Sequence, residues 1–404
     1  MRESRLGRTG SLAILLLCQV AAMACWFASN ASIAAIKAQH PLSPFFAALL
    51  TSSVQAGFVV GAFFSALLAL PDRIDKRRLF RLSALVAALC TGAAALLPPT
   101  SPVAPALRFA TGISLAGVYP VGMAMAATWA RGDLGLLIGL LVGALTLGSA
   151  SPHLAAAFGG LDWRAPILFA SAGALIAAAL AGFIGLGPNV ARAPEFRWSN
   201  VMLGWRSQPL RLANFGYFGH MWELYAMWAW IGAFVAASFR ARYGDAPPLP
   251  PALATFFIVA SGAFGALLGG FFADRVGRTL VTSLSMAVSG LCCLLIGFTF
   301  GGSAAAVLAV GFVWGVSVIA DSAQFSASTV ELCEPGLRGA MLTAQTCFGF
   351  LLTLASIHLM PDAVAALGWR YAFATLAIGP FLGVWAMLAL RARPEAEAMA
   401  GGRR

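Results

Sequence analysis

The chain has 404 residues, of which 10% are charged and 60% are hydrophobic, and its formal net charge at pH 7 is +11. A soluble domain carries about 25% charged residues, so this composition excludes an ordinary water-soluble globular protein. The basic excess does not indicate nucleic-acid binding, because the basic residues are spread over short connections between apolar runs instead of forming one polar domain.

Glycine, proline and charged residues divide the chain into twelve apolar segments. Apolar runs of this length are typical of membrane-spanning helices, and the sequence therefore predicts an all-α integral membrane protein with twelve transmembrane helices. In chain order the segments are 11–36, 43–70, 79–97, 103–130, 134–158, 164–187, 210–238, 251–272, 279–300, 304–331, 337–360 and 369–391. The run at 11–36 is interpreted as a retained first helix, not a signal peptide.

The longest polar connection, 188–209, contains Arg192, Arg197 and Arg206 and predicts a boundary between two halves. The predicted organisation is an N-terminal six-helix bundle at 1–187, a cytoplasmic linker at 188–209 and a C-terminal six-helix bundle at 210–404. The second bundle ends in a short cytoplasmic tail, and this polar segment after Arg391 is expected to fray.

The distribution of lysine and arginine predicts the orientation. Most of these residues precede the first segment, follow the second, or lie in the linker and the tail, which places them on one side of the membrane. The other side receives only Lys37, Arg164, Arg240, Arg242 and Arg370. Short cytoplasmic connections carry the excess of basic residues, so we expect both termini in the cytoplasm and the protein in the cytoplasmic (inner) membrane.

The sequence contains no pattern that indicates an enzyme. Its seven cysteines show no CxxC or Cys/His spacing typical of metal ligands, and they are interpreted as small residues that pack between helices. Nucleophile elbows, phosphate-binding loops and ATPase signatures are absent as well. We therefore predict neither a metal nor a cofactor.

Two similar charged turns indicate an internal repeat. Leu68-Ala-Leu-Pro-Asp-Arg-Ile-Asp-Lys76 and Gly270-Phe-Phe-Ala-Asp-Arg-Val-Gly-Arg278 both connect two apolar runs and lie about 200 positions apart. Phe109-Ala-Thr-Gly112 matches Phe312-Val-Trp-Gly315, and Leu161-Asp-Trp-Arg164 matches Leu367-Gly-Trp-Arg370, at nearly the same offset. Parallel repeats of six helices suit a protein whose halves rock around a site near the membrane midplane.

The turn at 270–278 resembles the G-x-x-x-D-R-x-G-R loop motif of the major facilitator superfamily, and the resemblance extends over the whole chain. It implies a secondary transporter with a central cavity between two six-helix bundles. The turn at 68–76 has Leu68 and Asp75 where the motif has glycine. The residues assigned to a cytoplasmic gate are Gly270, Asp274, Arg275, Gly277, Arg278, Asp72 and Arg73. Gly270 is expected to permit close helix approach, and Asp274 and Arg275 to bridge to neighbouring helix ends.

Other segments resemble particular branches of this superfamily. Arg108-Phe-Ala-Thr-Gly112 resembles a motif of proton-coupled members. Gly139, Gly148 and Pro152 are spaced as in drug–proton antiporters, although Ser151 replaces the glycine that precedes the proline. The segments 220–228 and 320–325 are similar to a branch near cyanate and nitrate-type carriers.

Arg108, Glu223 and Asp321 are ionisable residues inside predicted membrane helices. Such a side chain costs several kcal/mol unless it is paired or faces water, so each is a functional candidate. Arg108 would bind an anion, because a guanidinium stays charged and binds carboxylates through several donors; the alternative is a structural ion pair or bonds to backbone carbonyls. Glu223 and His220 share a helix face and would exchange a proton, with Asp321 as the second proton-coupling acid. The alternative for Glu223 is a structural hydrogen bond to a neighbouring helix.

Aromatic and polar side chains complete the predicted substrate site. Besides Arg108 they are Trp26, Asn30, Tyr119, Trp222, Tyr225, Trp228, Gln324 and Gln345. Aromatic residues also collect at membrane interfaces, and polar residues also join helices, so these structural roles remain the alternatives.

The sequence thus predicts a secondary active transporter that moves a small polar or anionic organic solute across the inner membrane by alternating access, coupled to protons. One alternative is a proton antiporter that exports drugs or hydrophobic cations. Another is a non-transporting membrane sensor on a carrier fold. The expected partners are the solute, protons and membrane lipid, without nucleic acid, and the chain is expected to act as a monomer.

Overall fold

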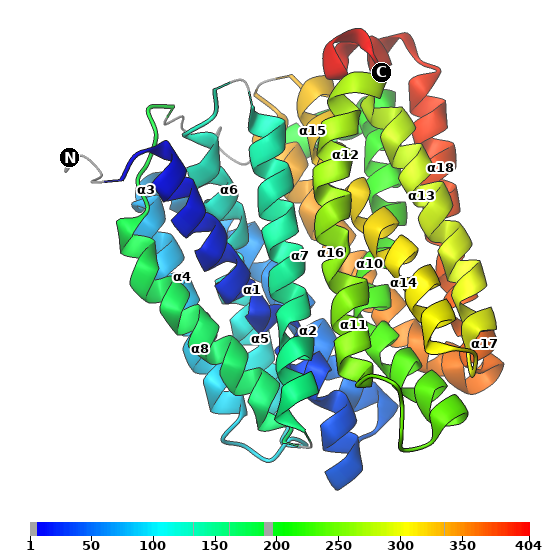
Figure 1. Cartoon of the computed structure of the whole chain (residues 1–404). Coiled ribbons are helices and arrows are strands. Elements are labelled where there is room, and N and C mark those ends of the chain that lie inside the picture. The colour runs from blue at the N-terminus through cyan, green and yellow to red at the C-terminus, as the bar shows by residue number, and fades with distance from the viewer. Residues whose placement is uncertain (1–5, 132, 161, 190–196, 335) are drawn as a thin grey trace. The chain divides into compact units, whose positions relative to one another are not determined.

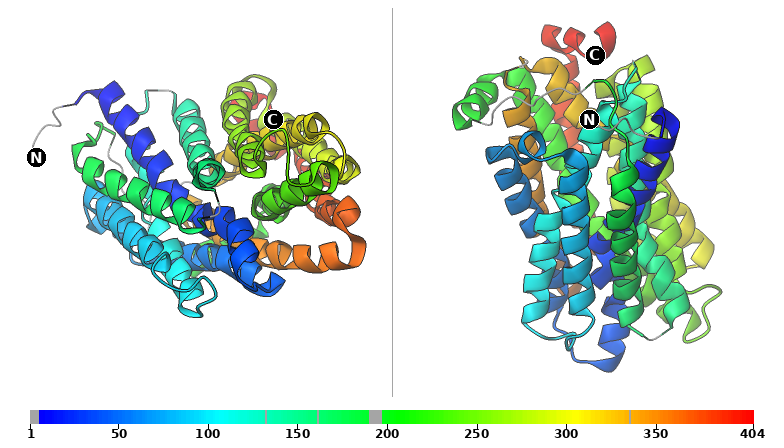
Figure 2. Two further views of the ribbon diagram at one scale, coloured as in Figure 1. Left: turned by 60° about the horizontal axis from the view of Figure 1, so that its bottom comes forward. Right: turned by 90° about the vertical axis from the view of Figure 1, so that its left-hand side faces the viewer.

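The computed structural model describes residues 6–131, 133–160, 162–189, 197–334 and 336–404. These residues form helices, turns and loops, and they divide into two compact units, Met1–Ala193 and Pro194–Arg404. Within each unit the long helices run side by side (Figure 1, Figure 2). Arg2, Arg5, Leu161, Arg192 and the linker residues 190–196 lie outside the described residues.

The described residues of the first unit form eight α-helices. They are α1 (Arg8–Gln39), α2 (Pro44–Leu67), α3 (Leu70–Arg73), α4 (Lys76–Ala94), α5 (Val103–Leu115), α6 (Tyr119–Ala127), α7 (Leu134–Gly159) and α8 (Arg164–Leu180). The second unit contains α9 (Trp198–Arg206), α10 (Gln208–Tyr243), α11 (Pro251–Ala260), α12 (Gly262–Val276), α13 (Arg278–Leu295), α14 (Ala304–Ala320), α15 (Ser322–Leu332), α16 (Arg338–Leu367), α17 (Trp369–Ala372) and α18 (Ile378–Arg391).

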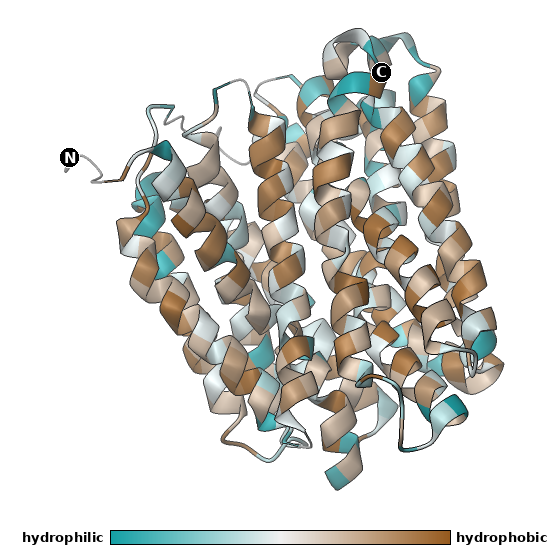
Figure 3. Ribbon diagram, in the orientation of Figure 1, coloured by the Kyte–Doolittle hydropathy of each residue, from teal (hydrophilic) through white to brown (hydrophobic). Residues whose placement is uncertain are grey.

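The predicted all-helical membrane architecture is confirmed. Among the described residues, 11 helical spans are long and apolar enough to cross a membrane. The remaining predicted segment, 79–97, corresponds to α4, whose first turns carry Arg77, Arg78 and Arg81. Hydrophobic residues dominate the lengths of the helices, whereas many of the hydrophilic ones gather near helix ends (Figure 3). This distribution is the one that a lipid environment favours.

Both units interrupt the same predicted segment at the same place. The fourth segment is divided into α5 and α6 at 116–118, and the tenth is divided into α14 and α15 at Asp321. Val118 and Asp321 are equivalent positions of the repeat. Interrupted helices at corresponding positions of two halves are the best general indicator of a transporter binding site. The residues around these two breaks are therefore candidates for such a site.

The two units also pack their second and fourth segments in the same way. A Cβ atom at Gly112 of α5 would overlap the main-chain oxygen of Val54 on α2. A Cβ atom at the equivalent Gly315 of α14 would overlap the main-chain oxygen of Ile258 on α11. Glycine is required at both places because the two backbones touch, and this shared contact supports the internal repeat in three dimensions.

Two polar segments form helical turns that pack against the second unit. The predicted linker contains α9, and Val201 on this helix packs against Ala340 and Ala344 of α16. The segment after Arg391 was expected to fray, but this prediction is wrong. It forms short 3-10 turns at Pro394–Ala398 and Ala400–Gly402 and folds over the ends of α12 and α15 (Figure 1).

Candidate functional site

Arg108 is buried in the first unit without an acidic partner. Its side chain is on α5 and the residue is 1% exposed. Nη2 donates a hydrogen bond of 2.6 Å to the main-chain oxygen of Trp26, next to a departure from helical geometry at Phe27 of α1. Nε and Nη1 have no hydrogen-bond partner, and no carboxylate in the described part of the chain forms an ion pair with this guanidinium.

Other candidates of the first unit lie on elements close to Arg108. Trp26 is buried and its ring centroid lies 4.9 Å from that of Phe58 on α2. Asn30 lies one turn farther along α1 and is half-buried, and Tyr119 is the first residue of α6, directly after the helix break. The structure therefore joins Arg108 to Trp26 and places Tyr119 at the interruption, whereas sequence separation alone linked none of them.

Glu223 is the centre of a buried cluster in the second unit. The residue lies on α10 and is 1% exposed. Its Oε2 accepts a hydrogen bond of 2.9 Å from Ser289, and its Oε1 accepts from Cys293 at 3.2 Å and from Trp314 Nε1 at 2.5 Å. The donors come from α13 and α14, so this carboxylate joins three helices.

His220 lies one turn before Glu223 on α10 but has different partners. Its Nδ1 is 2.9 Å from Oδ1 of Asp321, and its Nε2 is 3.0 Å from the hydroxyl of Ser322. Asp321 is the residue at which α14 and α15 are interrupted. The predicted proton-exchange residues thus form two separate groups: Glu223 with its donors, and His220 with Asp321.

The aromatic candidates of α10 contact apolar neighbours. The ring centroid of Tyr225 lies 5.7 Å from that of Trp228 and 4.9 Å from that of Phe350 on α16. Trp222 is half-buried against Gly379 of α18, and its indole Nε1 has no hydrogen-bond partner. These rings lie on the same helix as the two polar groups around Glu223 and His220.

The two glutamine candidates of the second unit take part in helix–helix hydrogen bonds. Nε2 of Gln345 on α16 donates to Thr329 at 2.9 Å, and its Oε1 is unpartnered. Oε1 of Gln324 accepts a hydrogen bond of 2.7 Å from Arg278. Gln324 therefore contacts the turn that was assigned to the gate.

Arg278 makes the bridge that we expected from Asp274 and Arg275. Its Nε and Nη2 donate to the two carboxylate oxygens of Glu331 on α15, at 2.6 and 2.7 Å. Asp274 lies 3.4 Å from Arg278, whereas Arg275 bonds to Phe271 on its own helix. The expected bridge from Arg275 is wrong, because its side chain turns back along α12.

The polar tail completes this network. The main-chain oxygen of Arg404 accepts from the hydroxyl of Thr279 at 3.0 Å, and Arg403 donates to the main-chain oxygen of Asp274 at 2.8 Å. Gly277 has a φ of +101°, and a Cβ atom there would overlap the main-chain oxygens of both arginines. Glycine is therefore required at position 277 for two reasons: the positive φ disfavours other residues, and the tail leaves no space for a side chain. Gly270 is half-buried in α12. A Cβ atom at its neighbour Gly269 would overlap the main-chain oxygen of Ala320 on α14.

The turn at 68–76 in the first unit is arranged differently. Asp72 lies 4.0 Å from Lys76, and Arg73 is exposed. Asp75, which replaces the second glycine of the motif, caps α4 by accepting from the main-chain nitrogens of Arg77 and Arg78. The side-chain hydrogen bonds from Arg77, together with those caps, hold the pKa of Asp75 below its ordinary value of 3.8.

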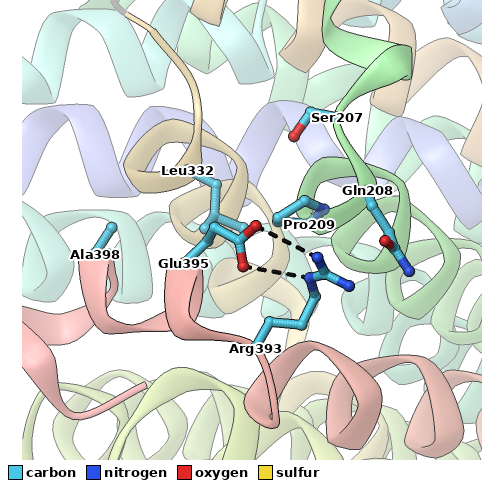
Figure 4. Close-up of a pocket in the computed structure, with 7 residues that line it drawn as sticks. All are labelled: Ser207, Gln208, Pro209, Leu332, Arg393, Glu395 and Ala398. Carbon is cyan, nitrogen blue, oxygen red and sulfur yellow. Dashed lines mark hydrogen bonds and ion pairs between the residues drawn. The ribbon is translucent and has the colours of Figure 1, made fainter.

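A surface pocket of about 500 Å³ opens at the end of the second unit where the tail lies. Arg393 and Glu395 on its wall form an ion pair at 3.3 Å (Figure 4). The pocket is lined by Ser207, Gln208, Pro209, Leu332, Arg393, Glu395 and Ala398. None of the candidate residues is in this lining, so we place no substrate there.

Several residues of these groups were missed by the sequence analysis. Ser289, Cys293 and Trp314 surround Glu223, Ser322 binds His220, and Glu331 binds Arg278. Serine, cysteine and tryptophan are common in membrane helices and carry no charge, so no signal separated them from packing residues. Glu331 is an acid at a helix end, where a carboxylate is ordinarily solvated, so its position did not indicate a partner.

The chain is similar to known proteins in sequence and in fold. A family model described as "Major Facilitator Superfamily" matches residues 15–244. No curated protein matches the chain. Among solved structures, a crystal structure of a mutant of the nucleoside transporter NupG matches with a TM-score of 0.73 and 14% identity, and the alignment covers 95% of this chain and 100% of that one. At this identity the structural likeness concerns the fold alone.

Proposed function

This chain belongs to the major facilitator superfamily, and from that premise we propose that it moves a small polar or anionic organic solute by proton-coupled secondary transport. It is an integral membrane transport protein, not an enzyme. The positions of lysine and arginine support an inner-membrane location with both termini in the cytoplasm. Alternating access is the transport mechanism that accompanies this proposal.

The proposal of an anionic solute is supported chiefly by the unpaired positive charge of Arg108. The guanidinium is buried, and two of its three nitrogens lack a hydrogen-bond partner. An uncompensated buried charge costs about 3–5 kcal/mol relative to a paired one. A carboxylate or phosphate group of the solute would supply both the missing charge and the missing acceptors. Trp26, whose main-chain oxygen positions Arg108, would contact the apolar part of the solute, and Asn30 and Tyr119 would bind its polar groups.

Proton coupling is assigned to the two polar groups of α10. Glu223 would bind and release the proton inside its shell of three donors. His220 and Asp321 would form the second proton site, at the helix interruption where a change in hydrogen bonding can alter the backbone. Trp222, Tyr225, Trp228, Gln324 and Gln345 remain proposed contacts of the solute.

The gate is assigned to the charged turns. Arg278 links α12, α13 and α15 through Asp274, Glu331 and Gln324. We assign cytoplasmic closure to this network, together with Gly270, Arg275 and Gly277 of the same turn and with Asp72 and Arg73 of the first unit.

Export of hydrophobic cations is the second candidate function. It is favoured by the position of a buried carboxylate, Glu223, on the same helix as the rings of Trp222, Tyr225 and Trp228. Aromatic faces attract cations, and an acid can exchange a proton for such a cargo.

The experiment that separates these functions is a screen of purified protein for ligands that raise the thermal midpoint, followed by uptake in proteoliposomes with an imposed pH gradient. A ligand that binds only the folded state raises apparent stability. The screen contains small organic acids, phosphorylated solutes, nucleosides, sugars and amphipathic cations. Stabilisation and gradient-driven uptake of an organic anion support the proposal. A response to amphipathic cations alone supports the second candidate, and silence across the screen supports a non-transporting sensor.

A further inference from the structure

The buried hydrogen bonds around Glu223 contain one group that can change its role. Trp314 Nε1 is a hydrogen-bond donor only, and the thiol of Cys293 is a weak donor and a weak acceptor. The hydroxyl of Ser289 has one proton and two accepting lone pairs. It lies 2.9 Å from Oε2 of Glu223 and 3.2 Å from the main-chain oxygen of Met286, so its single proton has two alternative acceptors.

These two acceptors correspond to the two protonation states of the carboxyl group. When Glu223 is ionised, the Ser289 hydroxyl donates to Oε2, and all three neighbours of the carboxylate act as donors. When a proton from water joins Oε2, the new O–H group needs an acceptor. Ser289 supplies it by rotating its own proton to the oxygen of Met286, which is already within reach.

We propose that Ser289 is a hydrogen-bond switch that satisfies Glu223 in both protonation states, at a site where the donors on Oε1 favour a proton over a sodium ion. The proposal rests on the proton coupling proposed above. Its chemistry balances: one proton adds to Oε2 on binding and leaves from Oε2 on release, while the Ser289 proton only rotates. No other covalent bond changes.

The exclusion of sodium follows from the donors on Oε1. Hard cations require several oxygen ligands. An indole N–H at 2.5 Å from Oε1 directs its positive end toward the position that a cation would occupy. The oxygens that the hydrogen bonds bring to this site, those of the carboxylate, Ser289 and the main chain of Met286, are fewer than the six or more that hard cations usually take, whereas a proton needs only one acceptor.

Other titratable groups near this site do not replace Ser289. Cys292 and Cys293 face Glu223 from α13, Asp321 acts on it from the break between α14 and α15, and His220 on α10 is the partner of Asp321. Of these four side chains, only the Cys293 thiol is hydrogen-bonded to Glu223, and a thiol is a poor acceptor. Removal of the Ser289 hydroxyl should therefore disturb proton binding at Oε2.

The test is infrared titration of the purified protein, which follows the C=O stretch of a protonated carboxyl group and needs no solute. The band that disappears in Glu223→Gln identifies Glu223. We expect Ser289→Ala to raise the midpoint of this band by about one pH unit, a tenfold change in proton affinity, because the hydrogen bond from Ser289 to the ionised carboxylate is stronger than the one that it accepts from the neutral acid. Ser289→Thr should restore the midpoint. Ser283→Ala is the matched control, because Ser283 is buried on the same helix and has no hydrogen-bond partner. Replacing potassium by sodium should leave the wild-type midpoint unchanged.

Each result has a distinct meaning. An unchanged midpoint in Ser289→Ala, with the Glu223 band still present, would overturn the switch and leave the proposed proton site intact. A midpoint that moves with sodium would overturn the ion selectivity. Absence of any titrating band that depends on Glu223 would overturn the proton step of the proposed function itself, and the switch with it.

Discussion

Nδ1 of His220 lies 2.9 Å from Oδ1 of Asp321, and both side chains are at most 2% exposed. The contact joins the middle of α10 to the interruption between α14 and α15, two positions far apart in the sequence. It occurs in the second unit only, because the position equivalent to Asp321 in the first unit is Val118. The break is thus shared by both halves, whereas its polar pair is specific to one.

Removing one member of the His220–Asp321 pair should lower the free energy of unfolding, and substituting both members should cost less than the sum of the two single losses. His220→Ala leaves the Asp321 carboxyl group buried without its partner, and we expect the free energy of unfolding to fall by about 3–5 kcal/mol. In the double variant with Asp321→Asn the loss should be smaller than the sum of the two single losses. Denaturant unfolding in detergent measures both. His358→Ala on α16, which removes a half-buried histidine, is the control, and additive losses would contradict the coupling.

Arg108→Lys tests the proposed anion site. Lysine keeps the positive charge but loses the planar set of donors that binds a carboxylate. Once the screen has identified an anionic solute, we expect its affinity to fall at least about tenfold, equivalent to about 1.4 kcal/mol. Arg164→Lys is the matched control, since Arg164 also donates to a main-chain oxygen, that of Ala95, but is exposed at a helix end. Equal affinity in the wild type and Arg108→Lys would exclude the direct contact.

Gly277→Ala tests the docking of the tail. We expect it to be more destabilising than Gly301→Ala, because both glycines have positive φ values, +101° and +70°, but only Gly277 faces the main-chain oxygens of Arg403 and Arg404. Gly277 also has a ψ of 148°, a backbone conformation that is essentially restricted to glycine, so the excess reports the backbone strain at Gly277 together with the overlap. Thermal unfolding of both variants measures it.

Deletion of residues 392–404 supplies the control for this comparison. Without the tail, the excess destabilisation of Gly277→Ala over Gly301→Ala should become smaller, because only the backbone strain remains. An excess of unchanged size in the shortened protein would show that the overlap with the tail contributes nothing.

Asp75 should contribute stability at neutral pH that disappears in acid. Its folded pKa lies below the ordinary 3.8, chiefly because Arg77 donates side-chain hydrogen bonds to it. For a depressed pKa, the contribution is complete above the unfolded value and is lost as pH falls through the folded value. The contribution is small because the side chain is 43% exposed. The difference in thermal midpoint between the wild type and Asp75→Ala should narrow toward zero below pH 3.8; a constant difference would argue against ionisation as its cause.

The membrane-spanning helices were predictable because the length and hydrophobicity of each apolar run depend on local composition alone. Apolar runs had to be long enough to span lipid, and the matching turns at 68–76 and 270–278 marked the two halves. The partners of Glu223 were not predictable in this way. Ser289, Cys293 and Trp314 are ordinary residues that acquire their role from the packing of α13 and α14 on α10, and one sequence contains no record of that packing.

The docking of the polar tail after Arg391 was not predicted from the sequence. A short polar segment rich in alanine and glycine, with charges of both signs, has no apolar face that predicts docking. Its order comes from main-chain oxygens that meet Thr279 and from arginines that meet acids and carbonyls. Interactions of main-chain groups are independent of residue type, so hydropathy and spacing do not reveal them.

The contact between Thr279 and Arg404 bears on where a reporter or an affinity tag is attached. A fluorescent reporter or affinity tag joined directly after Arg404 would have to leave from a point that lies against Gly277 and Thr279. Such a fusion would place new chain beside this contact, so a change in yield or melting temperature could come from the reporter as well as from the substitution under study. Libraries of variants of this protein are therefore best screened with the reporter at the other end of the chain.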